Sequence, residues 1–172
     1  MNPREPVSHL WLGDCLRLQG QIRQAKTAYD HALKLSDYDP GFSGRFSYYV
    51  IGSFLGPIGS KRAASRRDVN RDERNLAYLG MCSCELEANR LDTAVAACEE
   101  ALHWDPQDAY SYYLLGNAYL MKYAAAHGGE KELLLTAQKN YTKMLALNSD
   151  LEESDEARKQ LKEIDKALRR YR

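Results

Sequence analysis

Four cysteines are the residues of this sequence most able to bind a metal or form a covalent cross-link. They are Cys15, Cys82, Cys84 and Cys98. No two of them have the Cys-x-x-Cys spacing of structural zinc sites. Cys82 and Cys84 are two residues apart, which places them on different faces of a helix. We therefore predict small buried thiols in a reducing compartment, rather than a zinc site or disulfides.

Histidines and carboxylates give little support for catalysis. The four histidines are scattered, and none forms the i, i+4 pair that binds a metal on one helix face. They are His9, His31, His103 and His127. Adjacent acids such as Glu99 and Glu100 are expected on a helix face with no cleft. The sequence therefore predicts a protein that is not an enzyme and that has no catalytic, metal or cofactor site.

One segment could be taken for a strand that leads into a phosphate-binding loop. It begins at Tyr48-Tyr49 and ends at Gly59-Ser60-Lys61. A P-loop needs the order GxxxxGK[ST], because its lysine and hydroxyl must reach phosphate and magnesium from fixed places. Here the glycine spacing and the residue order differ, and no other strands are expected. We do not expect nucleotide binding.

A basic run that ends at Arg74 is a strong local charge in the sequence. Within it lie six basic residues: Lys61, Arg62, Arg66, Arg67, Arg71 and Arg74. Its functional interpretations are binding to an acidic partner, to RNA, or to an anionic membrane beside the apolar stretch 46–54. The simpler interpretation is a solvated helix face. Over the whole chain 24 basic residues balance 24 acidic ones, so no global field attracts nucleic acid.

No targeting or spanning segment is recognisable. The first residues lack the basic-then-apolar pattern of a secretory signal. The longest apolar run, 46–59, contains Pro57 and is shorter than the roughly 20 residues that span a bilayer. We predict a cytoplasmic location.

Internal repetition predicts the elements that position these side chains. Three segments each contain a Leu-Gly pair and, further on, an alanine: Leu12-Gly13 with Ala25, Leu79-Gly80 with Ala94, and Leu115-Gly116 with Ala137. Four residues after the alanine stand Tyr29, Cys98 and Tyr141 respectively. Small residues at recurring positions let two paired helices approach closely, and larger ones fill the space between pairs. The chain is therefore predicted to be all-α.

The frame and its turn residues divide the chain. Gly20, Pro106 and His127-Gly128-Gly129 are expected at helix ends. The predicted organisation is a single domain, 1–172, with repeats at 6–39, 73–108 and 109–150 and a capping helix at 151–172. The segment 40–72 is either a degenerate helix pair or an irregular insertion.

The frame resembles the tetratricopeptide repeat (TPR), in which a large residue, Leu-Gly and an aromatic are followed by Ala, an aromatic and Pro over 34 residues. The resemblance implies an α-solenoid of three TPR-like helix pairs, or four, whose first helices line a concave groove. The groove positions of the family correspond here to Leu10, Asp14, Arg17, Arg74, Ala77, Met81, Glu85, Tyr113, Asn117 and Leu120. TPR domains that clamp an acidic chaperone tail use Lys and Asn in the groove. Asn117 matches, but Leu10 and Asp14 do not, so we do not expect that clamp.

The predicted function is a scaffold that binds a peptide or helical segment of a partner protein in the groove. One alternative is an assembly unit that self-associates through its N-terminal face. Another is a peripheral membrane adaptor that uses segment 46–67. The sequence does not identify the partner.

Overall fold

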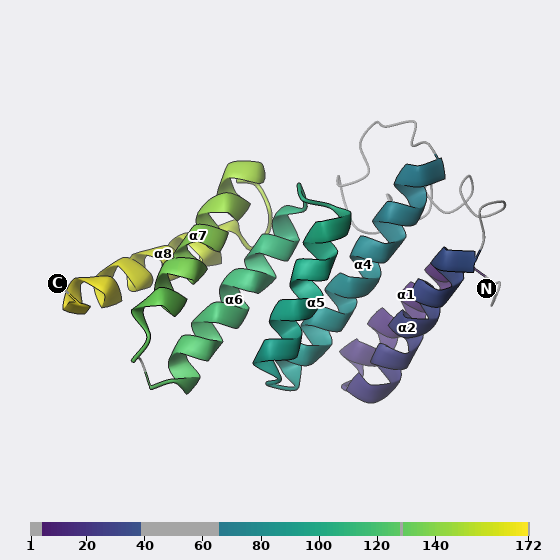
Figure 1. Ribbon diagram of the computed structural model, residues 1–172, viewed down its shortest axis with the longest axis horizontal. Coiled ribbons are helices and arrows are strands. Elements are labelled where there is room, and N and C mark those ends of the chain that lie inside the picture. Colours follow the sequence, from purple (N-terminus) through teal and green to yellow (C-terminus); the bar gives the residue numbers. More distant parts are fainter. Residues whose placement is uncertain (1–4, 39–65, 128, 172) are drawn as a thin grey trace. The chain divides into compact units, whose positions relative to one another are not determined.

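All regular structure in the described part of the chain is helical. The computed structural model describes residues 5–38, 66–127 and 129–171. Its elements are α1 (Pro6–Leu18), α2 (Ile22–Tyr38), α4 (Arg66–Glu87), α5 (Leu91–Trp104), α6 (Ala109–Ala125), α7 (Lys131–Leu147), α8 (Ser154–Leu168) and a final 3-10 turn, η2 (Arg169–Tyr171) (Figure 1). None of the described helices is long and apolar enough to cross a bilayer. The chain divides into two compact units, Met1–Gly80 and Met81–Arg172.

Helix ends fall where the turn residues predict them. α1 ends at Leu18, and Gly20 follows with a φ of 74°, a left-handed conformation that glycine adopts without strain. α5 ends at Trp104, just before Pro106. α6 ends at Ala125, and His127 has a φ of 52°. The connections are short, so each helix packs against the next in the pairs α1–α2 and α6–α7.

In the first unit, the ring of Tyr29 on α2 packs against two glycines from other helices. A Cβ on Gly13 of α1 would lie 2.5 Å from Cε1 of this ring, and a Cβ on Gly80 of α4 would also overlap it. Tyr29 is buried together with Ala25, Ala28 and Ala32 of the same helix. The recurring glycines therefore have the packing role that the repeat frame predicts.

The second unit repeats this arrangement with Tyr141 of α7. A Cβ on Gly116 of α6 would lie 2.7 Å from Cε1 of the Tyr141 ring. Tyr141 belongs to a buried cluster with Leu134, Met144 and, from α8, Ala157 and Ile164. α8 thus covers the last pair with its apolar stripe, as predicted for a capping helix.

The prediction of four reduced thiols is wrong for two of them. Cys82 of α4 and Cys98 of α5 form a disulfide with 5.3 Å between their Cα atoms. Cys98 occupies the position of Tyr29 and Tyr141, so a short side chain here leaves room for a bond between the helices. Cys82 and Cys98 have a sequence separation of 16 and lie on different helices, so their spacing along the chain does not indicate the bond. Cys15 and Cys84 take no part in a disulfide.

The predicted fold class, an all-α TPR-like arrangement of consecutive helix pairs with a C-terminal capping helix, is confirmed. α4 begins at Arg66, so the predicted boundary between 72 and 73 falls inside a helix. Most of segment 40–72 lies outside the described residues. The repeat limits and the single domain remain predictions.

Candidate functional site

Three residues of α6 form one partly exposed face. Tyr113, Asn117 and Leu120 are spaced by four and three residues, which places them on one side of a helix. The helix begins at Asp108, whose carboxylate accepts hydrogen bonds from the backbone N–H groups of Tyr110 (3.4 Å) and Ser111 (2.9 Å). This cap fixes the start of α6 and therefore the direction of its side chains.

Asn117 is oriented by the aromatic residue of the second helix. The hydroxyl of Tyr141 donates a hydrogen bond to Asn117 Oδ1 across 2.6 Å. Because the amide oxygen accepts, the two N–H donors of Asn117 Nδ2 are directed away from Tyr141. Burial raises the pKa of Tyr141, so its hydroxyl keeps the proton that it donates. Asn117 can thus offer donors to a partner's backbone or carboxylate.

Tyr113 extends this face with aromatic surface. Its ring stacks on Tyr110 with centroids 5.9 Å apart and lies against Tyr141 at 6.1 Å. Such rings present rigid apolar area at low entropic cost, a common property of protein-binding surfaces.

The first unit carries a related arrangement with different chemistry. The Tyr29 hydroxyl donates a hydrogen bond of 2.7 Å to Oδ1 of Asp14, the residue that follows Gly13. Asp14 is exposed. At this repeat position the first unit therefore presents a carboxylate, whereas the second unit presents an amide.

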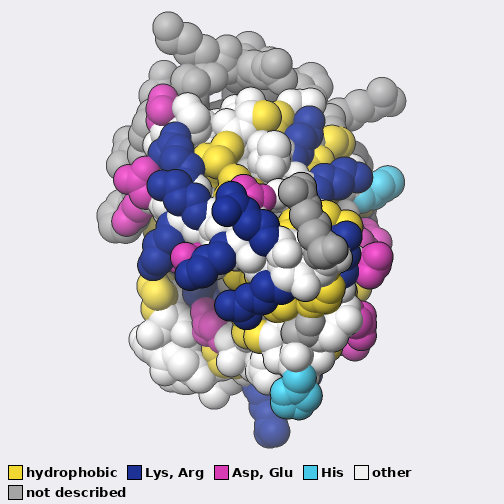
Figure 2. All heavy atoms as spheres, turned by 90° about the vertical axis from the view of Figure 1, so that its left-hand side faces the viewer, with side chains coloured by type: hydrophobic (Ala, Val, Ile, Leu, Met, Phe, Trp, Pro, Cys, Tyr) yellow, Lys and Arg dark blue, Asp and Glu magenta, His cyan; other side chains and the backbone are white. Residues whose placement is uncertain are grey.

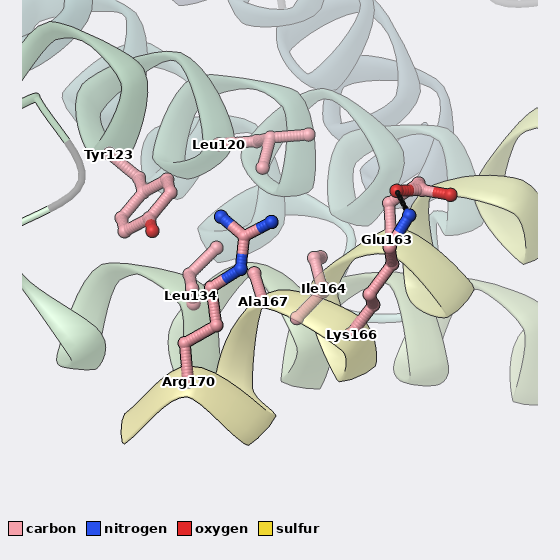
Figure 3. Close-up of a pocket in the computed structure, with 8 residues that line it drawn as sticks. All are labelled: Leu120, Tyr123, Leu134, Glu163, Ile164, Lys166, Ala167 and Arg170. Carbon is pink, nitrogen blue, oxygen red and sulfur yellow. Dashed lines mark ion pairs between the residues drawn. The ribbon is translucent and has the colours of Figure 1, made fainter. Parts of the chain in front are cut away.

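Leu120, at the end of the α6 face, lines a cavity of about 250 Å³ in the second unit (Figure 3). Its lining comes from α6, α7, α8 and η2: Leu120, Tyr123, Leu134, Glu163, Ile164, Lys166, Ala167 and Arg170. The hydroxyls of Tyr123 and Tyr171 lie 3.2 Å apart. This hydrogen bond raises the pKa of Tyr171 and ties η2 to α6 beside the cavity.

Comparison with known proteins bears on the fold. No protein-family profile and no curated protein sequence matches the chain. Among solved structures, the first TPR of Spaghetti (RPAP3), bound to the HSP90 peptide SRMEEVD, matches with a TM-score of 0.63 and 15% identity. The match covers 98% of this chain and 96% of that one. The chain has the tetratricopeptide repeat fold.

A further match, to the MamA protein, has a TM-score of 0.38 and 17% identity, and it covers 98% of this chain and 90% of that one. A score that low does not bear on the TPR assignment.

Three of the predicted groove residues of the TPR frame have buried side chains, so a partner would have little of their surface to contact. Leu10, Ala77 and Glu85 are buried. Glu85 accepts hydrogen bonds from Arg90 Nε and from Thr93 Oγ1, the latter at 3.0 Å, so its carboxylate is used within the TPR fold. The hydrogen bond and charge of Glu85 also raise the pKa of Arg90.

The other predicted groove residues are at least partly accessible. In the first unit these are Asp14, Arg17 and Arg74, and in the second Met81, Tyr113, Asn117 and Leu120. The structure brings the last three together on α6, and it places Asp14 and Arg17 on α1.

The sequence prediction missed the residues of α8 and η2 that share the cavity with Leu120, among them Ile164 and Arg170. The apolar stripe of α8 predicted a cap, but not the hollow beside it.

The described ranges contain no cluster of three or more His, Cys, Asp or Glu that could hold a metal.

Proposed function

We propose that the chain is a non-enzymatic protein-binding module that holds a peptide or helical segment of another protein on the exposed faces of its first helices. The observation that carries the proposal is the α6 face, where Tyr113, Asn117 and Leu120 combine aromatic surface, free N–H donors and one side of a cavity lined by both apolar and charged side chains. Binding sites for peptide segments typically join apolar anchors with a few placed polar groups.

The comparison supports a peptide partner in general terms. The solved TPR of Spaghetti (RPAP3) holds a peptide of HSP90. The likeness at 15% identity concerns the fold, so the partner of this chain is proposed from its own residues.

Quantitative affinity purification from native lysate tests the proposal. The wild type is compared with the double variant Tyr113→Ala/Asn117→Ala and with a control, Lys139→Ala/Lys143→Ala, on exposed positions of α7. Circular dichroism and urea unfolding confirm that each variant is folded. We expect the recovered amount of each specific partner to fall at least about tenfold with the α6 variant and to stay unchanged with the control. Retention of every partner by the α6 variant would exclude this face as the site.

Self-association is the second candidate, favoured by exposed leucines on α1. Leu12 is 47% exposed and Leu18 79% exposed. Apolar side chains exposed to this degree on one helix can form a contact between copies. Light scattering of Leu12→Glu tests it: a lower mass than the wild type supports an assembly role, and equal monomeric masses contradict it.

The membrane-adaptor alternative rests on segment 46–67, most of which lies outside the described residues, and it stays a prediction. The cytoplasmic location also stays a prediction. The Cys82–Cys98 disulfide is a feature more common in oxidising compartments.

A further inference from the structure

The cavity beside Leu120 has the size of one large side chain. Its base is formed by Leu134 and Ile164, each 1% exposed, and its sides by Leu120 and Ala167. Its volume of about 250 Å³ lies below the roughly 300–1,000 Å³ of sites for drug-sized ligands and cofactors. An apolar side chain that enters it gains burial without requiring hydrogen bonds from this base.

A cation lies over this apolar base. Figure 3 shows the Arg170 guanidinium reaching from η2 over Ala167 toward Leu120 and Tyr123. Arg170 is exposed, and no ion pair joins it to any acid in the described ranges. Lys166, at the other side of the cavity, forms a long ion pair of 3.8 Å with Glu163. Both side chains are well exposed, so this pair is weak.

Basic side chains outnumber acidic ones on the surface around the cavity, although Glu163 is among the lining residues. From residue 158 to 171 six basic residues accompany two acidic ones. Four of the basic residues recur at every fourth position: Arg158, Lys162, Lys166 and Arg170. Figure 2 shows Lys and Arg side chains gathered on the face that carries α8. Basic residues near the C-terminus of a helix interact favourably with the helix dipole. That interaction does not account for the cavity with an apolar base beside Arg170.

We propose that this cavity receives one apolar side chain of an acidic peptide segment and that Arg170 binds the carboxylate beside that side chain. The proposal rests on the peptide-binding function above and gives that partner a chemistry. Arg matches a carboxylate through two parallel N–H donors, so it would fix the peptide's position as well as attract it. The basic row along α8 would attract the remaining acidic residues, and the affinity would fall as salt rises.

Selection of a random 12-residue peptide library on the wild-type protein supplies the probe. We expect enriched sequences with Leu, Ile, Met or Phe next to Asp or Glu. The synthetic peptides are then measured by fluorescence anisotropy against Arg170→Glu, Ala167→Phe and a control, Lys143→Glu. The control makes the same charge change at an exposed position of α7 that does not line the cavity.

We expect affinity to fall at least about tenfold for Arg170→Glu and for the cavity-filling Ala167→Phe, and less than about threefold for Lys143→Glu. Arg170 is exposed, so its variant is expected to fold even if Ala167→Phe does not. Enrichment of basic or uncharged peptides, no enrichment at all, or unchanged binding to Arg170→Glu would each overturn the proposal.

Two further measurements distinguish this proposal from peptide binding on the α6 face alone and from binding to a membrane. Peptides that lose affinity for Tyr113→Ala but not for Arg170→Glu would keep the proposed function and refute the cavity's role. Sedimentation with phosphatidylserine vesicles that depends on Arg170, without any peptide enrichment, would overturn the proposal in favour of a membrane surface.

Discussion

The hydroxyl of Tyr141 donates a 2.6 Å hydrogen bond to the side-chain carbonyl of Asn117, across the pair formed by α7 and α6. The buried aromatic of the second helix thus orients a polar residue on the exposed face of the first. Tyr29 and Asp14 repeat the relationship at 2.7 Å in the other unit. In both units, core packing and the chemistry of the surface depend on one side chain.

Tyr141→Phe should separate these two effects. The ring remains to fill the space against Gly116, but Asn117 Oδ1 loses its donor, so we expect a loss of about 1 kcal/mol in the free energy of unfolding. Urea unfolding measures it. Tyr112→Phe removes a longer, exposed hydrogen bond of 3.4 Å and should change the stability by less than about 0.5 kcal/mol. Equal effects of the two variants would mean that the Tyr141–Asn117 bond does not contribute.

Gly116→Ala should destabilise the fold although alanine is the better helix former. The new Cβ would lie 2.7 Å from the Tyr141 ring, so the helices must separate, at a cost of about 2 kcal/mol in unfolding free energy. Gly129→Ala is the control, because its Cβ would meet only Ala126 O at 3.5 Å. Thermal unfolding of both variants measures the difference. A Gly116→Ala protein as stable as the wild type would refute the close packing.

Reduction of the Cys82–Cys98 disulfide should lower stability by about 2–3 kcal/mol, since the bond closes a loop with a sequence separation of 16. The urea midpoint with and without dithiothreitol measures this difference. The variant Cys15→Ser/Cys84→Ser should retain the full dependence on reductant, and Cys82→Ser/Cys98→Ser should lose it. Four reactive thiols in the unreduced, denatured protein would contradict the bond.

The stability of the first unit should fall with rising pH because of Glu73. This carboxyl is 4% exposed, and neither of its oxygens has a hydrogen-bond partner. Burial, with smaller contributions from the charges of Asp72 and Glu5, raises its pKa from 4.5 to about 7. The folded state therefore holds the proton more tightly than the unfolded state. The stabilisation that comes from the raised pKa of Glu73 is fully present below pH 4.5 and is lost as pH rises through about 7.

Glu73→Gln tests this expectation. The variant should exceed the wild type in unfolding free energy by about 3 kcal/mol at pH 8, and the difference should vanish near pH 4. Glu100→Gln, an exposed position of α5, serves as the control. A difference between wild type and Glu73→Gln that does not vary with pH would show that folding does not raise the pKa of Glu73.

The repeat frame predicted the backbone well, because its landmarks are the residues whose size fixes the helix pairs. The frame requires a glycine of the first helix to pack against an aromatic residue of the second, as Gly13 does with Tyr29 and Gly116 does with Tyr141. The frame did not predict burial at Glu85, since partners for its carboxylate come from the next helix, at Arg90 and Thr93.

The cavity could not be predicted from the sequence for a related reason. Leu120 and Arg170 lie on elements far apart along the chain, and whether both line one cavity depends on how α8 packs on the last pair. Spacing within one helix carries no information on such packing. A row of basic residues at every fourth position of α8 was the available signal, but alone it indicates only a solvated face.

The placement of Tyr29 between Gly13 and Gly80 has a consequence for synthesis on the ribosome. Until residue 80 has left the exit tunnel, one side of this ring has no glycine to cover it. The first helix pair would then emerge with its main aromatic residue half-solvated and would acquire its full stability only when α4 arrives. A nascent chain stalled before that point should be far more sensitive to protease than one stalled after it.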